Sequence, residues 1–180
     1  MQLTDAQVTA LLEPFDYNIV EQRKSDGQQI VPHEYVRARL SEIFGPLNWS
    51  EQTLELKEID LSHFSRSSEE AGYYAIAYSA LVRVTVRYPD GSPGGSWDGA
   101  GAWGVERDRK KPTPIWEMHS DCRNGALSVA FLRATKNLGA QFGQTLYSQG
   151  QPIYTPRFYL LHPPPAEPMQ PTLDPEGALA

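Results

Sequence analysis

The sequence has a single cysteine, Cys122, and no run of apolar residues long enough to cross a bilayer. One cysteine cannot form an internal disulfide, and chains without disulfides are typical of reducing compartments. A spanning helix needs roughly 18 consecutive apolar residues, so no membrane contact is predicted. The first residues also lack the basic start and apolar block of a secretion signal. We therefore expect a cytoplasmic protein, with Cys122 as a small buried residue rather than a nucleophile.

The sequence also lacks the motifs of common catalytic and cofactor sites. Its four histidines, His33, His63, His119 and His162, do not have metal-ligand spacing. The glycine-rich stretch at 91–104 is not followed by the Gly-Lys-Ser/Thr of a P-loop. We predict no catalytic residue, no metal and no cofactor, and hence no enzyme. The glycines instead indicate a hairpin turn followed by a strand with close backbone contacts.

Positive charge is scarce overall, because the net charge is -6, but it is unevenly distributed. Residues 1–60 carry five Lys and Arg against eleven Asp and Glu. Residues 122–157 carry four cations and no acid: Arg123, Arg133, Lys136 and Arg157. A local basic surface can therefore coexist with an acidic total.

Apolar periodicity predicts an α+β fold of helix, hairpin and helix, then an antiparallel β-meander packed against a long C-terminal helix. The helices are expected at 3–15, where Thr4 and Gln7 fit a capping box, and at 33–45. The hairpin is expected at 17–31, with its turn at 26–27. The meander strands are expected at 48–61, where the apolar positions are Trp49, Leu54, Leu56 and Ile59, and at 72–88 and 97–106. We expect a core domain at 1–160 and a proline-rich, disordered tail at 161–180.

The last helix is predicted at 115–147, despite Gly125 and Gly139. At about 100° per residue, one arc is apolar and is expected to pack on the sheet: Leu127, Phe131, Ala134, Leu138 and Phe142. The opposite arc holds Arg133, Lys136, Asn137 and Gln144, with Ala126, Ala130 and Ala140 around them. Small neighbours would let an extended ligand approach the backbone. Cations one turn apart, with no acid between Asp121 and Glu167, suit a row of phosphates, although such residues also occur on ordinary solvated helix faces.

Five segments in this order resemble the Rad52 family of single-strand annealing and recombination proteins, including its phage and bacterial relatives. They are "IVEQRKSDGQQIVPHEYV", "LSEIFGPLNWS", "ALVRVTVRYPDGS", "DGAGAWG" and "GALSVAFLRATKNLGAQFG". The resemblance covers about residues 14–147. In the last segment, basic residues come before two pairs that each consist of an apolar residue and a glycine. Here these pairs are Leu138-Gly139 and Phe142-Gly143.

The resemblance implies a set of DNA-binding residues. Arg133 matches an arginine of the family's DNA groove, and Lys136 matches a second groove cation. Arg23 matches an arginine of the first hairpin. Lys110 and Lys111 lie where the family has a lysine before the long helix. Asn137, Lys24 and Arg123 complete the candidate set. Leu132 stands where the family often has lysine, which removes one charge from the groove.

The implied function is binding and ATP-independent annealing of single-stranded DNA in homologous recombination and double-strand break repair. The partners would be single-stranded DNA, further copies in a ring or spiral, and a recombinase or single-strand-binding protein. The location would be a bacterial nucleoid or a phage-infected cell. Two alternatives stay open. One is a DNA-end-protecting single-strand binder that anneals poorly. The other is an α+β module for an apolar ligand or protein, with a pocket formed by Trp97, Trp103, Tyr73 and Tyr74.

Overall fold

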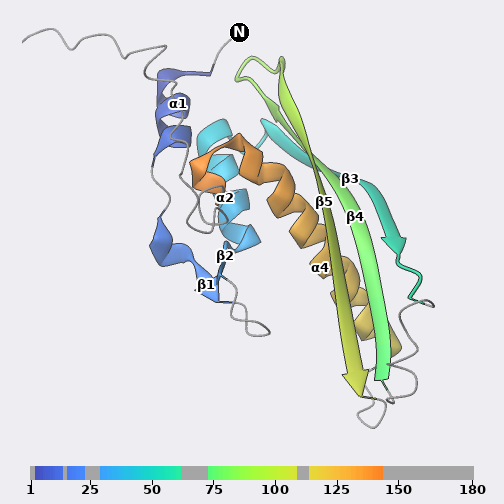
Figure 1. Ribbon diagram of the computed structural model, residues 1–180. Helices are drawn as coiled ribbons and strands as arrows, with labels where there is room; N and C mark the ends of the chain where they lie inside the picture. The colour runs from blue at the N-terminus through green and yellow to red at the C-terminus, as the bar shows by residue number, and fades with distance from the viewer. Residues whose placement is uncertain (1–2, 14–15, 23–28, 62–72, 109–113, 144–180) are drawn as a thin grey trace, which may run out of the picture. The chain divides into compact units, whose positions relative to one another are not determined.

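The computed structural model describes residues 3–13, 16–22, 29–61, 73–108 and 114–143. These residues form the predicted α+β fold: short N-terminal helices and a hairpin, an antiparallel meander, and a long helix on the sheet (Figure 1). The predicted turn at 26–27, the end of the long helix at 144–147, the boundary at 160 and the tail at 161–180 lie outside the described residues.

The first helix, α1, spans Asp5–Leu12 and begins at the predicted capping box. The Thr4 hydroxyl accepts a bond from the Gln7 amide at 3.2 Å, and the Gln7 side-chain oxygen accepts one from the Thr4 amide at 3.0 Å. Two of the helix's otherwise unpaired N-terminal groups are thus satisfied. The Gln7 side chain also donates to the carbonyl of Ile43 at 3.1 Å, which ties α1 to the end of the next helix.

The predicted hairpin is described at its two outer ends, and residues 23–28 between them lie outside the described residues. Its first part is a 3₁₀ turn, η1, at Tyr17–Ile19, and the described pairing joins β1 (Glu21–Gln22) and β2 (Gln29–Ile30). Helix α2 follows at His33–Phe44 as predicted and ends where Gly45 has φ 91°. That left-handed conformation is readily adopted only by glycine. The apolar stripe of α2 is in the core, with Val36, Leu40, Ile43 and Phe44 buried.

The meander has the order β3 (Trp49–Glu58), β4 (Tyr73–Arg87) and β5 (Pro93–Asp108). β3 contains a bulge between Thr53 and Glu55. The bulge places the extra residue, Leu54, outside the core with 38% of its surface exposed. The predicted apolar face of this strand was therefore wrong at Leu54, while Trp49 and Leu56 do pack on the core.

Helix α4 spans Ile115–Thr135 and lies along one face of the sheet (Figure 1). Besides the buried Phe131 and Thr135, five of its buried side chains recur every four residues: Met118, Cys122, Ala126, Ala130 and Ala134. We call these five residues the buried row. A spacing of four advances the buried position by about 40° at each step, so the row winds around the helix instead of following one arc. Such a winding row fits a helix that crosses a twisted sheet.

The buried row corrects the predicted exposed arc. Ala126 and Ala130 are fully buried and do not flank a ligand. Their backbone faces Gly99 and Gly101 of β5, where any added Cβ would overlap the helix backbone. At Gly101, a Cβ would lie 2.7 Å from the Ala126 carbonyl oxygen. The predicted close backbone contact at these glycines is therefore confirmed, with α4 as its partner.

The last helix is shorter than predicted. The α-helix ends at Thr135 and continues as two 3₁₀ turns, η2 (Lys136–Leu138) and η3 (Ala140–Phe142). Gly139 between them has φ 154°, which excludes a continuous helix and suits glycine. The break brings η3 against α1, where the Gln141 amide donates to the Glu13 carbonyl at 2.6 Å.

Candidate nucleic-acid interface

The buried row is flanked by two sides of α4, and the face opposite the row points away from the sheet. Residues that precede a member of the row by one position project about 100° to one side, and residues that follow one project to the other. The first side faces β5, because Gly125 lies against the ring of Trp103. The second side faces β3, because Phe131 lies 6.4 Å from Trp49 between ring centroids. We call them the β5 side and the β3 side of α4.

Arg133 lies on the β5 side, one position before Ala134, and is exposed. Its Nη1 donates to the carbonyl oxygen of Ala100 in β5 at 2.9 Å. No described carboxylate pairs with it. The guanidinium is therefore outside the packed interior and is not neutralised by any carboxylate of the described ranges, and a backbone acceptor holds it at one point.

The Ala100 carbonyl belongs to the outer edge of the sheet. The Arg87 amide donates to the Asn48 carbonyl at 2.7 Å, and the Ala77 carbonyl accepts from the Ile59 amide at 2.9 Å. Odd-numbered residues of β4 therefore turn their backbone groups toward β3. Leu81 is one of these, so its partner Ala100 is not hydrogen-bonded to β4 and faces away from the sheet. Arg133 thus marks the free edge of β5.

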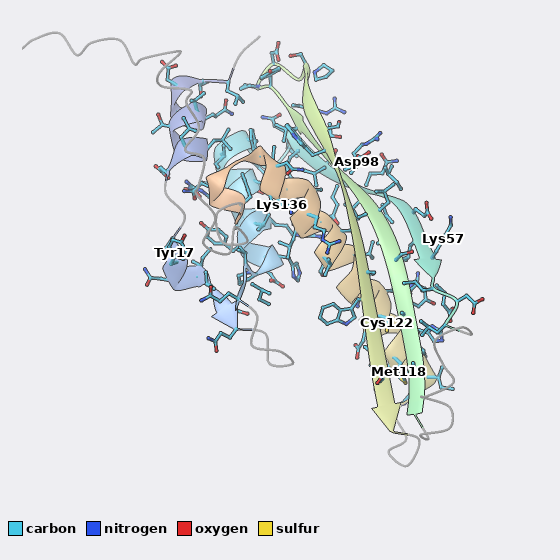
Figure 2. All side chains as sticks on the ribbon, in the orientation of Figure 1. Tyr17, Lys57, Asp98, Met118, Cys122 and Lys136 are labelled. Atoms are coloured by element: carbon cyan, nitrogen blue, oxygen red, sulfur yellow. The ribbon has the colours of Figure 1, made fainter. Side chains whose placement is uncertain are left out.

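Lys136 and Asn137 extend this region past the end of α4. Lys136 is the C-cap residue that follows α4, where Figure 2 labels it, and it is partly exposed. Asn137 is exposed and follows Lys136 in the 3₁₀ turn η2, four residues after Arg133. No ion pair with a described carboxylate involves either residue. The structure therefore brings together three of the eight candidate residues.

The cations with described side chains fall into two groups. Four form ion pairs with carboxylates: Arg37 with Glu51, Arg39 with Glu13 and Glu42, Lys57 with Glu55, and Arg83 with Asp98. Four form none: Arg87, Arg123, Arg133 and Lys136. Three of the unpaired cations are on α4 or in the turn that follows it. Uncompensated positive charge is therefore concentrated on this helix.

Arg123 is not part of the Arg133 group. It follows Cys122 by one position and therefore lies on the β3 side of α4. Burial raises the pKa of the Tyr78 phenol above its ordinary value, and the negative charge of Glu58 raises it further. The positive charge of Arg123 acts in the opposite direction, so Arg123 lies near Tyr78. The Tyr78 hydroxyl in turn donates to Glu58 of β3 at 3.2 Å. Arg123 thus sits toward one edge strand and Arg133 toward the other.

The remaining candidates, Arg23, Lys24, Lys110 and Lys111, lie outside the described residues. Of the aromatic residues considered for an apolar pocket, Trp103 lies against Gly125, and Trp97 packs on the core. The side chains of Tyr73 and Tyr74 are not described. Both tryptophans thus serve the contact between sheet and helix.

Two features were not predicted from the sequence. The first is the Ala100 carbonyl that holds Arg133, and its only sequence signal is the alternation of glycine and alanine in β5. The second is an open hollow of about 460 Å³ on the first three turns of α4, lined by Trp116, His119, Ser120, Arg123, Asn124 and Leu127. The four-residue spacing of His119, Arg123 and Leu127 was a usable signal for it.

Within the described ranges, no three His, Cys, Asp or Glu side chains are placed to hold a metal ion. None of the described helices is long and apolar enough to cross a membrane. A search of curated proteins finds no match for this chain. A sequence profile described as "Rad52/22 family double-strand break repair protein" matches residues 4–155, which include the sheet, α4 and the Arg133 region. The chain therefore belongs to the Rad52/22 family of double-strand break repair proteins.

Proposed function

We propose that this protein binds single-stranded DNA along the β5 side of α4 and anneals complementary strands without ATP. The observation that carries the proposal is the group of unpaired charges formed by Arg133 and Lys136. Elsewhere in the described chain, most cations are already neutralised by a carboxylate. Because the chain belongs to a family of double-strand break repair proteins, we expect a DNA phosphate to supply the negative charge that these cations lack.

Arg133 is well suited to hold a phosphate. A guanidinium has five N–H donors in a fixed plane, and its described hydrogen bond is a single one from Nη1 to Ala100. That bond limits the motion of the side chain before DNA arrives, which reduces the entropy lost on binding. Lys136 adds a charge three residues later, and the Asn137 amide adds uncharged hydrogen-bonding groups next to Lys136.

The position of these cations also sets a condition on binding. They lie at the C-terminal end of α4, where the helix dipole contributes about half a negative charge. The helix end itself therefore repels phosphate, and attraction depends on the side-chain charges. Removing one of them should weaken binding more than the loss of an ordinary surface cation would.

Contacts to phosphate give affinity without sequence preference, because the backbone is the same at every position. An annealing protein needs this property, since any two complementary strands must be accepted. Bases that are not gripped stay available for pairing with a second strand. Arg23, Lys24, Lys110 and Lys111 stay part of the proposed surface.

One copy presents only a short row of free cations, so a continuous track requires several copies. We propose a ring or spiral in which the Arg133 regions of successive copies line one groove. Within the described residues β5 pairs only with β4, and an edge strand of this kind readily pairs with another chain. Association of copies is therefore consistent with the described sheet.

The direct test is annealing of two complementary oligonucleotides, one carrying a fluorophore and the other a quencher, without nucleotide or metal. We expect the full chain to accelerate the loss of fluorescence well above the spontaneous rate. Binding of a single strand without acceleration would contradict annealing and support the end-protecting alternative. Absence of any single-strand binding would overturn the proposal and favour an ordinary solvated helix face.

A further inference from the structure

The hollow on α4 is separate from the Arg133 region. Its lining residues His119, Arg123 and Leu127 all lie one position after a member of the buried row, on the β3 side. The acids of the same helical turns, Glu117 and Asp121, precede the row by one position and do not line the hollow. The hollow therefore combines a cation with neutral walls.

An exposed aromatic ring forms one end of this hollow. Trp116 has 70% of its surface exposed, which is unusual for so large an apolar side chain. The other tryptophans, Trp49, Trp97 and Trp103, are partly buried against the core. Trp116 is thus the tryptophan of the described chain that offers its ring to solvent.

The polar groups of the hollow are free to bind. Ser120, Arg123 and Asn124 have no hydrogen-bond partner among the described residues. His119 is fixed instead, because its Nδ1 lies 2.9 Å from the Tyr78 hydroxyl, which also bonds Glu58 at 3.2 Å. The sheet thus immobilises one wall, while the amide, hydroxyl and guanidinium groups remain unsatisfied.

We infer that this hollow binds a nucleobase of single-stranded DNA, stacked on Trp116, with Arg123 on the adjoining phosphate. The inference rests on the proposed function and adds a second contact site to it. An indole stacks on any base, because every base has a π face, so the site preserves binding without sequence preference. A volume of about 460 Å³ is within the range of ligand sites and can hold a base.

The spacing of the residues agrees with a nucleotide. Trp116 and Arg123 are seven residues apart, which is about 10.5 Å along a helix. A base on the indole and a phosphate of the same strand near the guanidinium span that separation, with the Ser120 hydroxyl between them and the Asn124 amide just beyond Arg123. The unpaired charge of Arg123 and the absence of acids in the lining favour an anionic ligand, and membership of a DNA repair family makes a nucleic acid the expected anion.

The test compares two oligonucleotides of equal length and charge, one of thymidines and one with an abasic backbone. Both are titrated into the full chain, and binding is followed by fluorescence anisotropy of a labelled strand. Trp116→Ala should weaken binding of the thymidine strand about tenfold, since one stacked base is lost, and leave the abasic strand unchanged. Trp116→Phe should retain most of the affinity.

Intrinsic fluorescence provides a second measurement. The thymidine strand should quench wild-type tryptophan emission by stacking, and this quenching should disappear in Trp116→Phe. Ile115→Ala is the matched control, because Ile115 is the adjacent apolar residue, 57% exposed, and does not line the hollow. It should bind both strands as the wild type does.

The outcomes separate the two hypotheses. If the wild type binds both strands and Trp116→Ala binds them equally well, the base site is wrong and the proposed function stands. An equal loss of affinity for the thymidine strand in Trp116→Ala and Ile115→Ala would also overturn the base site. The loss would then follow from removing any exposed apolar side chain in this part of α4. If the wild type binds neither strand, the proposed function fails together with the base site.

Discussion

At the scale of single residues, the same cation type has different roles according to its partner. Arg83 and Arg133 are both exposed or partly exposed arginines beside β5. Arg83 is held by two bonds of 2.7 Å to the Asp98 carboxylate, whereas Arg133 meets a neutral carbonyl. A carboxylate cancels the charge that a phosphate would need, and a carbonyl does not.

This difference predicts unequal effects on DNA binding. Arg133→Gln should weaken single-strand binding and reduce the slope of log affinity against log salt by about 0.7 for the lost phosphate contact. The double substitution Arg83→Gln with Asp98→Asn, the matched control, should change neither, because it removes an ion pair whose charges already cancel. Anisotropy titrations at several salt concentrations would measure both. An unchanged slope in Arg133→Gln would contradict the phosphate contact.

A second prediction at this scale concerns the effect of one glycine, Gly101, on stability. Gly101→Ala would place a Cβ 2.5 Å from the Ala130 amide nitrogen, so α4 would have to move from β5. We expect a loss of roughly 1–3 kcal/mol in the free energy of unfolding, as is typical of overpacked interiors. Urea denaturation would measure it. Gly104→Ala is the control, since its Cβ would have only an ordinary contact of 3.4 Å with Ala77, and its stability should be near the wild-type value.

At the scale of elements, α4 is positioned by small residues on both partners. The buried row winds around the helix. On β5, Gly99 and Gly101 lie against the helix backbone, and Trp103 lies against Gly125. This arrangement fixes which residues face each edge of the sheet. It separates the Arg133 region from the Trp116 hollow, although both are on one helix.

The pairing of β4 with β5 should weaken in acid. Hydrogen bonds from Arg83 lower the pKa of Asp98 below the ordinary value of 3.8, so the paired carboxylate stabilises the fold above that pH. This contribution is lost as the pH falls through the lowered pKa. The stability difference between wild type and Asp98→Asn should therefore be full near neutral pH and shrink below about pH 4. Urea denaturation across that range would measure it, and a constant difference would contradict the ion pair.

At the scale of the whole molecule, an acidic chain carries a locally basic surface. The net charge of -6 keeps most of the surface unattractive to DNA, while Arg133 and Lys136 stay uncompensated. We therefore expect DNA to be attracted mainly to the parts of α4 and η2 where the described cations lack carboxylate partners. Association of copies would multiply these parts into a track.

The proposed assembly of several copies predicts the mass of the particle in solution. Light scattering after gel filtration should give a mass several times the chain mass of 20.1 kDa at micromolar concentration. Arg133→Gln should give the same mass, because the side chain is exposed and makes no core contact. A wild-type monomer would contradict the ring or spiral and would favour a small binding module.

Much of the fold followed from local sequence signals. The capping box of Thr4 and Gln7, the end of α2 at Gly45 and the burial of Cys122 were predicted from residue type and spacing, and the structure confirms them. Local rules suffice in these cases because each depends on bonds or conformations within a few residues. The presence of cations without nearby acids on the last helix was determined in the same way.

Only the tertiary structure decided which way those residues face. A helical wheel assumes a straight apolar stripe, so it placed Ala126 and Ala130 with the cations, whereas the twisted sheet buries a winding row that contains both. The same winding separates Arg123 from Arg133, and the bulge in β3 exposes Leu54. The sequence alone determines how much charge the helix carries. Where that charge points depends on the angle between helix and sheet, which is set by contacts between residues far apart in the chain.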